Sequence, residues 1–180
     1  VEKFVVAKHR RLIGWDEILE GGLAPEATVM SWRGMDGGRE AARLGHDVVM
    51  TPGSHTYFNS YQGRPEFEPP AGGGYLPLGK VYSFEPVPED LTSEQAAHIL
   101  GGQSCLWGEF IPNARQAEYM MLPRLAAMSD VLWSQKHRRD PRHFFGRIET
   151  QMRRYGAAGY ACATSAYSVT MTSVLDTAKR

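Results

Sequence analysis

Short, mainly apolar segments alternate with stretches of helical periodicity, and no other feature of the sequence constrains the fold as strongly. We expect strands at residues 11–15, 27–32, 47–50 and 103–107. Strands as short and as apolar as these are typical of a parallel sheet that is covered on both faces. Their alternation with helices predicts an α/β fold, either an open doubly wound sheet or a (β/α)8 barrel.

Helical patterns occupy most of the remaining sequence. They cover residues 1–10, 37–44, 92–100, 113–133 and 141–155, and a loop rich in glycine and proline spans residues 53–88. Pro123 interrupts the longest pattern and fits best in the first turn of a new helix. Large apolar residues at helical spacing are expected in the core, namely Met120, Met121, Met128 and Trp133.

The number of strand–helix units sets the expected domain organisation. Four units make half of a (β/α)8 barrel, which typically needs about 250 residues. An isolated half would leave strand edges unpaired, so we expect a missing N-terminal half of the barrel as a partner. Residues 1–156 are predicted to form the C-terminal half of the barrel, and residues 157–180 an exit segment that starts a β-rich extension or accessory domain.

Composition excludes several classes of partner. The formal net charge is zero, with 20 basic and 20 acidic residues. Nucleic acids and anionic membranes attract a basic excess, so neither is expected as a partner. The glycines at residues 72–74 lack the Lys-Ser/Thr of a phosphate loop, and His137, Asp140 and His143 match no strong metal motif. No cofactor or metal is expected, and the oligomeric state stays open.

Each of the four expected strands has an aromatic residue at or just beyond its carboxyl end: Trp15, Trp32, Tyr57 and Trp107. In a parallel barrel the carboxyl ends of the strands lie on one face, where active sites form. Aromatic rings there can stack on the apolar face of a sugar, although any single ring could simply plug the rim of the barrel. Polar neighbours that could bind sugar hydroxyls are Asp16, Glu17, Arg33, Asn59 and Glu109. Arg33 is expected to pair with a carboxylate and not to be catalytic.

Several blocks of sequence resemble a known family. They are RLIGWDEI at residues 11–18, SWRG at 31–34, YFNSYQ at 57–62, VYSFEP at 81–86 and GGQSCLWGE at 101–109. In this order and spacing they resemble glycoside hydrolase family 20, the β-N-acetylhexosaminidases. Residues 123–134 resemble the penultimate helix block of that family.

The resemblance implies a retaining hydrolysis in which the substrate's own 2-acetamido oxygen attacks the anomeric carbon, so that the enzyme supplies no nucleophile. Tyr57 matches the tyrosine that orients the acetamido oxygen. Trp15 and Trp32 match the walls around the acetamido methyl group, and Trp107 matches the platform beneath the pyranose ring. Glu109 matches a buried carboxylate that accepts sugar hydroxyl protons.

Two features depart from the family pattern. Asn59 stands where the family commonly has an aspartate that contacts sugar hydroxyls, so it keeps an acceptor oxygen without the charge. The adjacent aspartate and glutamate that catalyse the reaction in the family have no match in this chain. Asp16 and Glu17 are adjacent acids, but they belong to a different block, and we expect Glu17 to support a loop.

Two hypotheses follow. The first is part of an enzyme that releases terminal N-acetylglucosamine or N-acetylgalactosamine from β-linked glycans or chitin fragments. The second is a barrel module that binds amino sugars without cleaving them. Under both, the partner is a carbohydrate, and the resemblance implies a periplasmic or secreted location.

Overall fold

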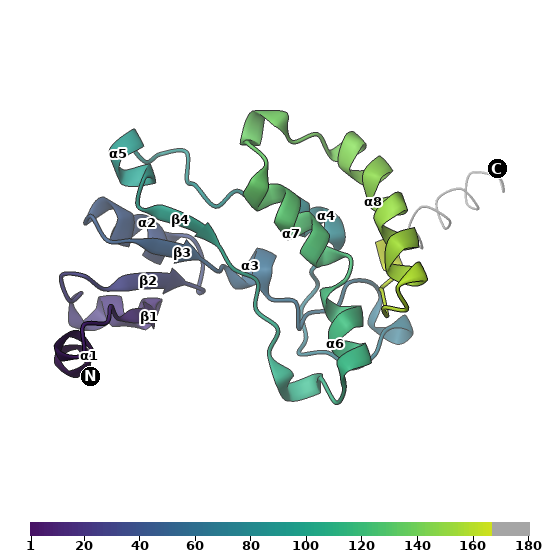
Figure 1. The fold of residues 1–180 in the computed structure, drawn as a ribbon, viewed down its shortest axis with the longest axis horizontal. Coiled ribbons are helices and arrows are strands. Elements are labelled where there is room, and N and C mark those ends of the chain that lie inside the picture. Colours follow the sequence, from purple (N-terminus) through teal and green to yellow (C-terminus); the bar gives the residue numbers. More distant parts are fainter. Residues whose placement is uncertain (167–180) are drawn as a thin grey trace. The chain divides into compact units, whose positions relative to one another are not determined.

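The computed structural model describes residues 1–166, which divide into two compact units (Figure 1). The first, called the sheet unit below, comprises residues 1–56 and 85–103. The second, called the helical unit, comprises residues 57–84 and the chain from residue 104 onward. No helix within residues 1–166 is long and apolar enough to cross a membrane.

The sheet unit contains four parallel strands and the helices that connect them. Its elements are α1 (Glu2–Ala7), β1 (Ile13–Trp15), a 3-10 helix at Asp16–Gly21, β2 (Thr28–Ser31), α2 (Asp36–Arg43), β3 (Val48–Met50), α3 (Gly53–Thr56), α5 (Ser93–Ala96) and β4 (Ile99–Gly102). The strands follow one another across the sheet in the order β1-β2-β3-β4, as Figure 1 shows. A doubly wound sheet reverses its strand order at a switch point, and this order has no reversal.

Helix α2 lies very close to the sheet, and Gly38 makes this approach possible. A Cβ atom at Gly38 would lie 2.6 Å from the sulfur of Met50 and 2.9 Å from a methyl group of Val48. Both of these strand residues are completely buried, as are Ala41 and Val29. The amide of Gly38 also donates to the hydroxyl of Ser31 at 2.9 Å, which anchors the start of the helix to the end of β2.

The helical unit packs helices around an apolar core. Its elements are a 3-10 helix at Pro65–Phe67, α4 (Leu78–Tyr82), a 3-10 helix at Gly108–Phe110, α6 (Ala114–Met121), α7 (Arg124–Trp133), a 3-10 helix at Lys136–Arg138 and α8 (Pro141–Ala157). The rings of Tyr82 and Phe144 stack with centroids 4.0 Å apart, which joins α4 to α8. Pro123 separates α6 from α7 at the start of the second helix, as its sequence position predicts.

The structure corrects two predicted elements. The fourth strand is Ile99–Gly102 and not residues 103–107, and the helix before it ends at Ala96. Thr92 and Gln95 form the predicted helix start as a complete capping box, but the helix continues for only one turn. An apolar run as short as residues 99–102 fits a buried strand or a helix equally well, which explains the error.

Two other expectations differ from the structure. Met120 and Met128 are buried as predicted, whereas Trp133 is 90% exposed and lies outside the core of the described residues. The predicted β-rich segment after residue 158 contains no strand between residues 159 and 166. The remainder of that segment lies outside the described residues.

Candidate functional site

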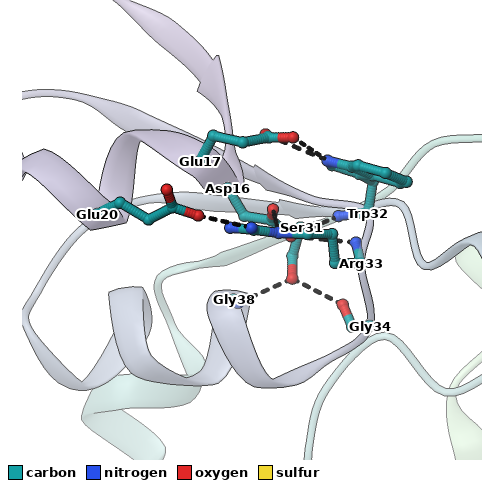
Figure 2. Close-up of polar contacts among 8 residues, drawn as sticks. All are labelled: Asp16, Glu17, Glu20, Ser31, Trp32, Arg33, Gly34 and Gly38. Carbon is teal, nitrogen blue, oxygen red and sulfur yellow. Dashed lines mark hydrogen bonds and ion pairs between the residues drawn. The ribbon is translucent and has the colours of Figure 1, made fainter.

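Two of the predicted aromatic residues, Trp15 and Trp32, lie at the carboxyl ends of neighbouring strands of the sheet unit. Trp15 ends β1, where it pairs with Met30, and Trp32 directly follows β2. Asp16, only 2% exposed, connects the two strand ends. One oxygen of its carboxylate accepts the backbone N–H groups of Trp32 at 3.0 Å and of Arg33 at 3.1 Å (Figure 2). Asp16 therefore fixes the chain on both sides of the Trp32 side chain.

Arg33 pairs with carboxylates, as the sequence predicts. Its Nε donates to the other oxygen of Asp16 at 2.6 Å, and its Nη1 donates to Glu20 at 2.6 Å. Hydrogen bonds to Glu20 and Asp16 raise the pKa of the Arg33 guanidinium. Arg33 and Glu20 thus lie at the outer side of the cluster, and Asp16 lies at its buried side (Figure 2).

Glu17 binds the indole ring of Trp32. Its two carboxylate oxygens lie 3.0 and 3.2 Å from the indole Nε1, which donates to them (Figure 2). Asp16 holds the backbone of Trp32 and Glu17 holds its ring, so the adjacent acids both act on one tryptophan. This arrangement agrees with the loop-supporting role expected for Glu17.

A cavity of about 430 Å³ lies beside the cluster, and Asp16 and Arg33 are among the residues that line it. Its walls come from the 3-10 helix at Asp16–Gly21, the loop after β2 and the start of α2. Neither Trp15 nor Trp32 is among the residues that line it. It therefore adds no wall to the predicted acetamido pocket.

The helical unit brings Tyr57 and Trp107 together. Tyr57 forms a parallel bridge with Cys105, and the amide of Phe58 donates to the carbonyl of Cys105 at 2.7 Å. Trp107 follows two residues later, and its ring centroid lies 6.4 Å from that of Tyr57, with the ring planes tilted by 51°. A hydroxyl-bearing ring and a 39% exposed indole therefore lie side by side.

Asn59 lies on the same turn as Tyr57. The turn is closed by a hydrogen bond from the amide of Ser60 to the carbonyl of Tyr57 at 3.3 Å. The carbonyl of Asn59 accepts the amide of Gly72 at 2.8 Å, and a Cβ atom at Gly72 would lie 2.7 Å from the side-chain nitrogen of Asn59. No group within the described residues donates to the buried side-chain oxygen of Asn59.

Glu109 departs from expectation because its side chain is exposed and not buried. It lies in the one-turn 3-10 helix Gly108–Phe110, which begins directly after Trp107. An exposed carboxylate is solvated, so any contact that it makes with a sugar hydroxyl must first displace water.

Arg124 is the residue that the sequence did not single out. It is 0% exposed, and its guanidinium donates to backbone carbonyls of Phe58, Ser60, Leu76 and Met120. Burial lowers the pKa of Arg124 to about 9, against an opposing effect of Glu68. One signal was available: Arg124 occupies the buried helical stripe of α7 that continues at Met128 and Val131.

Among residues 1–166, no group of three or more His, Cys, Asp or Glu side chains could hold a metal ion. The structure places Trp15 and Trp32 in the sheet unit, and Tyr57, Asn59, Trp107 and Glu109 in the helical unit.

The parallel sheet with a tryptophan at the ends of two strands, and the separate Tyr57–Trp107 pair, define a class of protein, an α/β protein with a candidate carbohydrate site. Residues 1–136 match the family described as glycosyl hydrolase family 20, catalytic domain. The chain therefore belongs to glycosyl hydrolase family 20.

Individual relatives agree with this assignment. The chain is 49% identical over 147 residues to a β-hexosaminidase of Porphyromonas gingivalis, which covers 81% of this chain and 19% of that protein. It is 34% identical over 131 residues to a β-hexosaminidase of Vibrio furnissii, which covers 71% of this chain and 21% of that protein. The chain thus spans about a fifth of the length of these curated relatives.

Solved structures share the fold. One is the family 20 exo-β-N-acetylglucosaminidase of Vibrio harveyi in complex with N-acetylglucosamine, at 30% identity and a TM-score of 0.80. The match covers 91% of this chain and 26% of that chain. The family 20 β-N-acetylhexosaminidase of Streptomyces coelicolor matches with a TM-score of 0.81 at 22% identity, over 92% of this chain and 35% of that chain, and supports the fold alone.

Proposed function

We propose that the chain is the C-terminal half of a (β/α)8 barrel in a β-N-acetylhexosaminidase, and that it supplies the sugar-binding and acetamido-binding side of the active site. The unreversed strand order β1-β2-β3-β4 supports a barrel, because a doubly wound sheet contains a switch point. The observation that carries the proposal is the pairing of Tyr57 with Trp107 in a chain of family 20.

The proposed reaction cleaves a terminal β-linked N-acetylhexosamine with retention. The acetamido oxygen of the substrate forms a bond to the anomeric carbon while the bond to the leaving oxygen breaks and a general acid protonates that oxygen. Water then attacks the anomeric carbon of the cyclic intermediate and gives a proton back to the deprotonated general acid, while the bond between the anomeric carbon and the acetamido oxygen breaks. Tyr57 donates its hydroxyl hydrogen bond to the acetamido oxygen and keeps this nucleophile in line with the anomeric carbon.

The tryptophans shape the pocket in this proposal. Trp107 lies beneath the pyranose ring, where its partly exposed indole offers a stacking surface beside Tyr57. Trp15 and Trp32 surround the acetamido methyl group. The bonds from Asp16 and Glu17 support this role, since they fix both the backbone and the ring of Trp32.

Asn59 and Glu109 bind sugar hydroxyls in this proposal. The buried side-chain oxygen of Asn59 accepts no hydrogen bond within the described residues, and a sugar hydroxyl could donate to it. Glu109 lies two residues after Trp107 in the chain, and a carboxylate accepts a stronger hydrogen bond from a sugar hydroxyl than a neutral group does. The general acid and its aspartate partner are proposed to come from the N-terminal half of the barrel, and no cofactor takes part.

The test is the substitution Tyr57→Phe in a protein that joins this chain to the proposed N-terminal half. It should lower kcat for a chromogenic N-acetylglucosaminide, because the hydroxyl acts on the reacting oxygen. A change in KM with kcat unchanged would contradict the role of Tyr57.

The 180-residue chain provides the companion measurement. It should not hydrolyse the same substrate, since a general acid typically contributes about 10²–10⁴-fold. It should still bind N-acetylglucosamine, measured by tryptophan fluorescence, and Trp107→Ala should weaken that binding. A joined protein that binds the sugar without any turnover would instead favour the amino-sugar-binding module.

A further inference from the structure

We propose that Arg124 is a positioning residue, which acts on the candidate site by holding the Tyr57–Ser60 turn in place. Arg124 and the Tyr57–Ser60 turn both lie in the helical unit, and their contacts are direct. Its consequence for sugar binding rests on the proposed function, because that function assigns Tyr57 and Asn59 to the substrate.

Five hydrogen bonds to backbone carbonyls converge on the guanidinium of Arg124. Its Nε donates to the carbonyl of Met120 at 3.1 Å, and Nη1 donates to Ser60 at 3.0 Å and to Leu76 at 3.1 Å. Nη2 donates to Phe58 and also to Met120. An arginine has five N–H donors, so all of them are used on backbone carbonyls.

Two of these carbonyls belong to the turn that carries Tyr57. Phe58 and Ser60 stand on either side of Asn59, so their bonds to Arg124 restrain the peptide units around it. The ring of Phe58 also lies over the guanidinium, 4.9 Å from its carbon to the ring centroid. Arg124 therefore contacts both the backbone and a side chain of the turn that carries Tyr57.

Backbone hydrogen bonds also join the turn and Tyr61 to the segment at residues 72–76. The carbonyl of Asn59 accepts from Gly72, and the amide of Tyr61 donates to Gly74 at 3.2 Å. The carbonyl of Tyr61 accepts from Leu76 at 2.8 Å. Arg124 also donates to the carbonyl of Leu76 in this second segment, so one side chain bonds to both segments.

A lysine cannot reproduce this arrangement. Lysine keeps the positive charge, but its ammonium has three donors at a single nitrogen, whereas the guanidinium has a fixed fork of five. Arg124→Lys should therefore keep the helical unit folded and loosen the turn. The Arg124→Lys variant therefore distinguishes a role of the guanidinium in positioning the turn from a role of the buried positive charge alone.

The first experiment measures amide hydrogen exchange by NMR in the 180-residue chain. In Arg124→Lys, exchange of the amides of Phe58, Tyr61 and Gly72 should become at least about tenfold faster, since bonds from a charged donor are worth that factor or more. None of these amides bonds to Arg124, so their exchange reports on the turn itself. The amides of α8 should change by less than about twofold, as in the surface control Arg153→Met.

Uniform acceleration across α8 and the turn would show a role in stability alone and would overturn the proposal. Unchanged exchange in the turn would also overturn it. If Arg124→Lys does not fold, Gly72→Ala tests the same turn from the opposite side, because the added methyl group meets the side chain of Asn59. Its control is Gly146→Ala, where a Cβ atom meets nothing within 4 Å.

The second experiment links the turn to the sugar. Titration with N-acetylglucosamine should show weaker binding to Arg124→Lys and to Gly72→Ala than to wild type, by about tenfold, the factor that a displaced hydrogen bond costs. The Gly146→Ala control should bind as wild type does. If wild type binds no sugar, the proposed function fails while the exchange result still decides the role of Arg124.

Discussion

Each unit of the molecule contains a cluster built around an arginine, and the two clusters use opposite chemistry. In the sheet unit, the side chain of Arg33 is 44% exposed and pairs with the carboxylates of Asp16 and Glu20. In the helical unit, Arg124 is completely buried, and all five N–H groups of its guanidinium donate to backbone carbonyls. The exposed guanidinium of Arg33 is neutralised by carboxylates, whereas the buried guanidinium of Arg124 is stabilised by the dipoles of peptide carbonyls.

The buried charged group is an acid in one cluster and an arginine in the other. In the sheet unit the buried member is the acid Asp16, which bonds the backbone around Trp32, and the arginine is the outer partner. In the helical unit the buried member is the arginine, which bonds the backbone around Asn59. In both clusters a buried charged side chain holds the backbone beside a predicted sugar-binding residue.

The pKa shifts of the two arginines have opposite signs, and so does their linkage to stability. The pKa of Arg33 is raised by its acids, so its contribution is fully present below the unfolded value and is lost only as pH rises through the folded one. Burial lowers the pKa of Arg124 to about 9. Above that pH the unfolded state binds the proton more tightly than the folded state does, so the desolvation penalty on folding is present at neutral pH and is relieved as pH rises through about 9.

The largest expected effect breaks the buried arginine cluster. Arg124→Met removes the five guanidinium donors that bond to four backbone carbonyls. It should lower the free energy of unfolding of the helical unit by about 3–5 kcal/mol. Urea unfolding followed by circular dichroism measures this loss. Arg153→Met, an exposed arginine on α8, is the matched control and should change the free energy by less than about 0.5 kcal/mol. Equal effects of the two substitutions would show that the buried carbonyls find other donors.

An intermediate effect is expected from the buried acid of the sheet unit. Asp16→Ala leaves the amides of Trp32 and Arg33 without their acceptor and should cost about 2 kcal/mol of unfolding free energy. Tryptophan fluorescence in the same urea titration should also change, because Trp32 loses its backbone anchor. Glu40→Ala, an exposed acid on α2, provides the control for loss of a negative charge. A loss no larger than that of the control would mean that water replaces Asp16.

The local features of the sheet unit could be predicted from the sequence. Three of the four strands, the helix α2 and the pairing of Arg33 with an acid all follow from patterns within a few residues or between adjacent strand ends. Asp16 follows Trp15 directly, and its partners follow the next strand, so short-range order already brings them together. The fourth strand was misplaced because residues 99–102 carry no pattern that separates a strand from a helix.

The features of the helical unit depend on contacts that are distant in sequence, and the predictions there were less complete. Arg124 bonds to residues 48 to 66 positions earlier in the chain, and no local pattern indicates such partners. The sequence around Gly72 excludes a phosphate loop but does not predict that this glycine makes room for the side chain of Asn59. Trp133 has helical spacing but the structure leaves it exposed, because periodicity identifies a face of a helix and not what covers it.

The smallest expected effect concerns the outer arginine. Arg33→Met removes the ion pairs to Asp16 and Glu20 but keeps the backbone N–H of residue 33, which still donates to Asp16. The thermal midpoint should therefore fall by less than in Asp16→Ala at low salt. The remaining difference from wild type should shrink further at 1 M salt, where the Debye length is only about 3 Å and exposed pairs are screened. Thermal unfolding at two salt concentrations measures both quantities. A fall in the thermal midpoint as large as that of Arg124→Met, and unaffected by salt, would contradict the expected difference. It would mean that the exposed and the buried arginine stabilise their units equally.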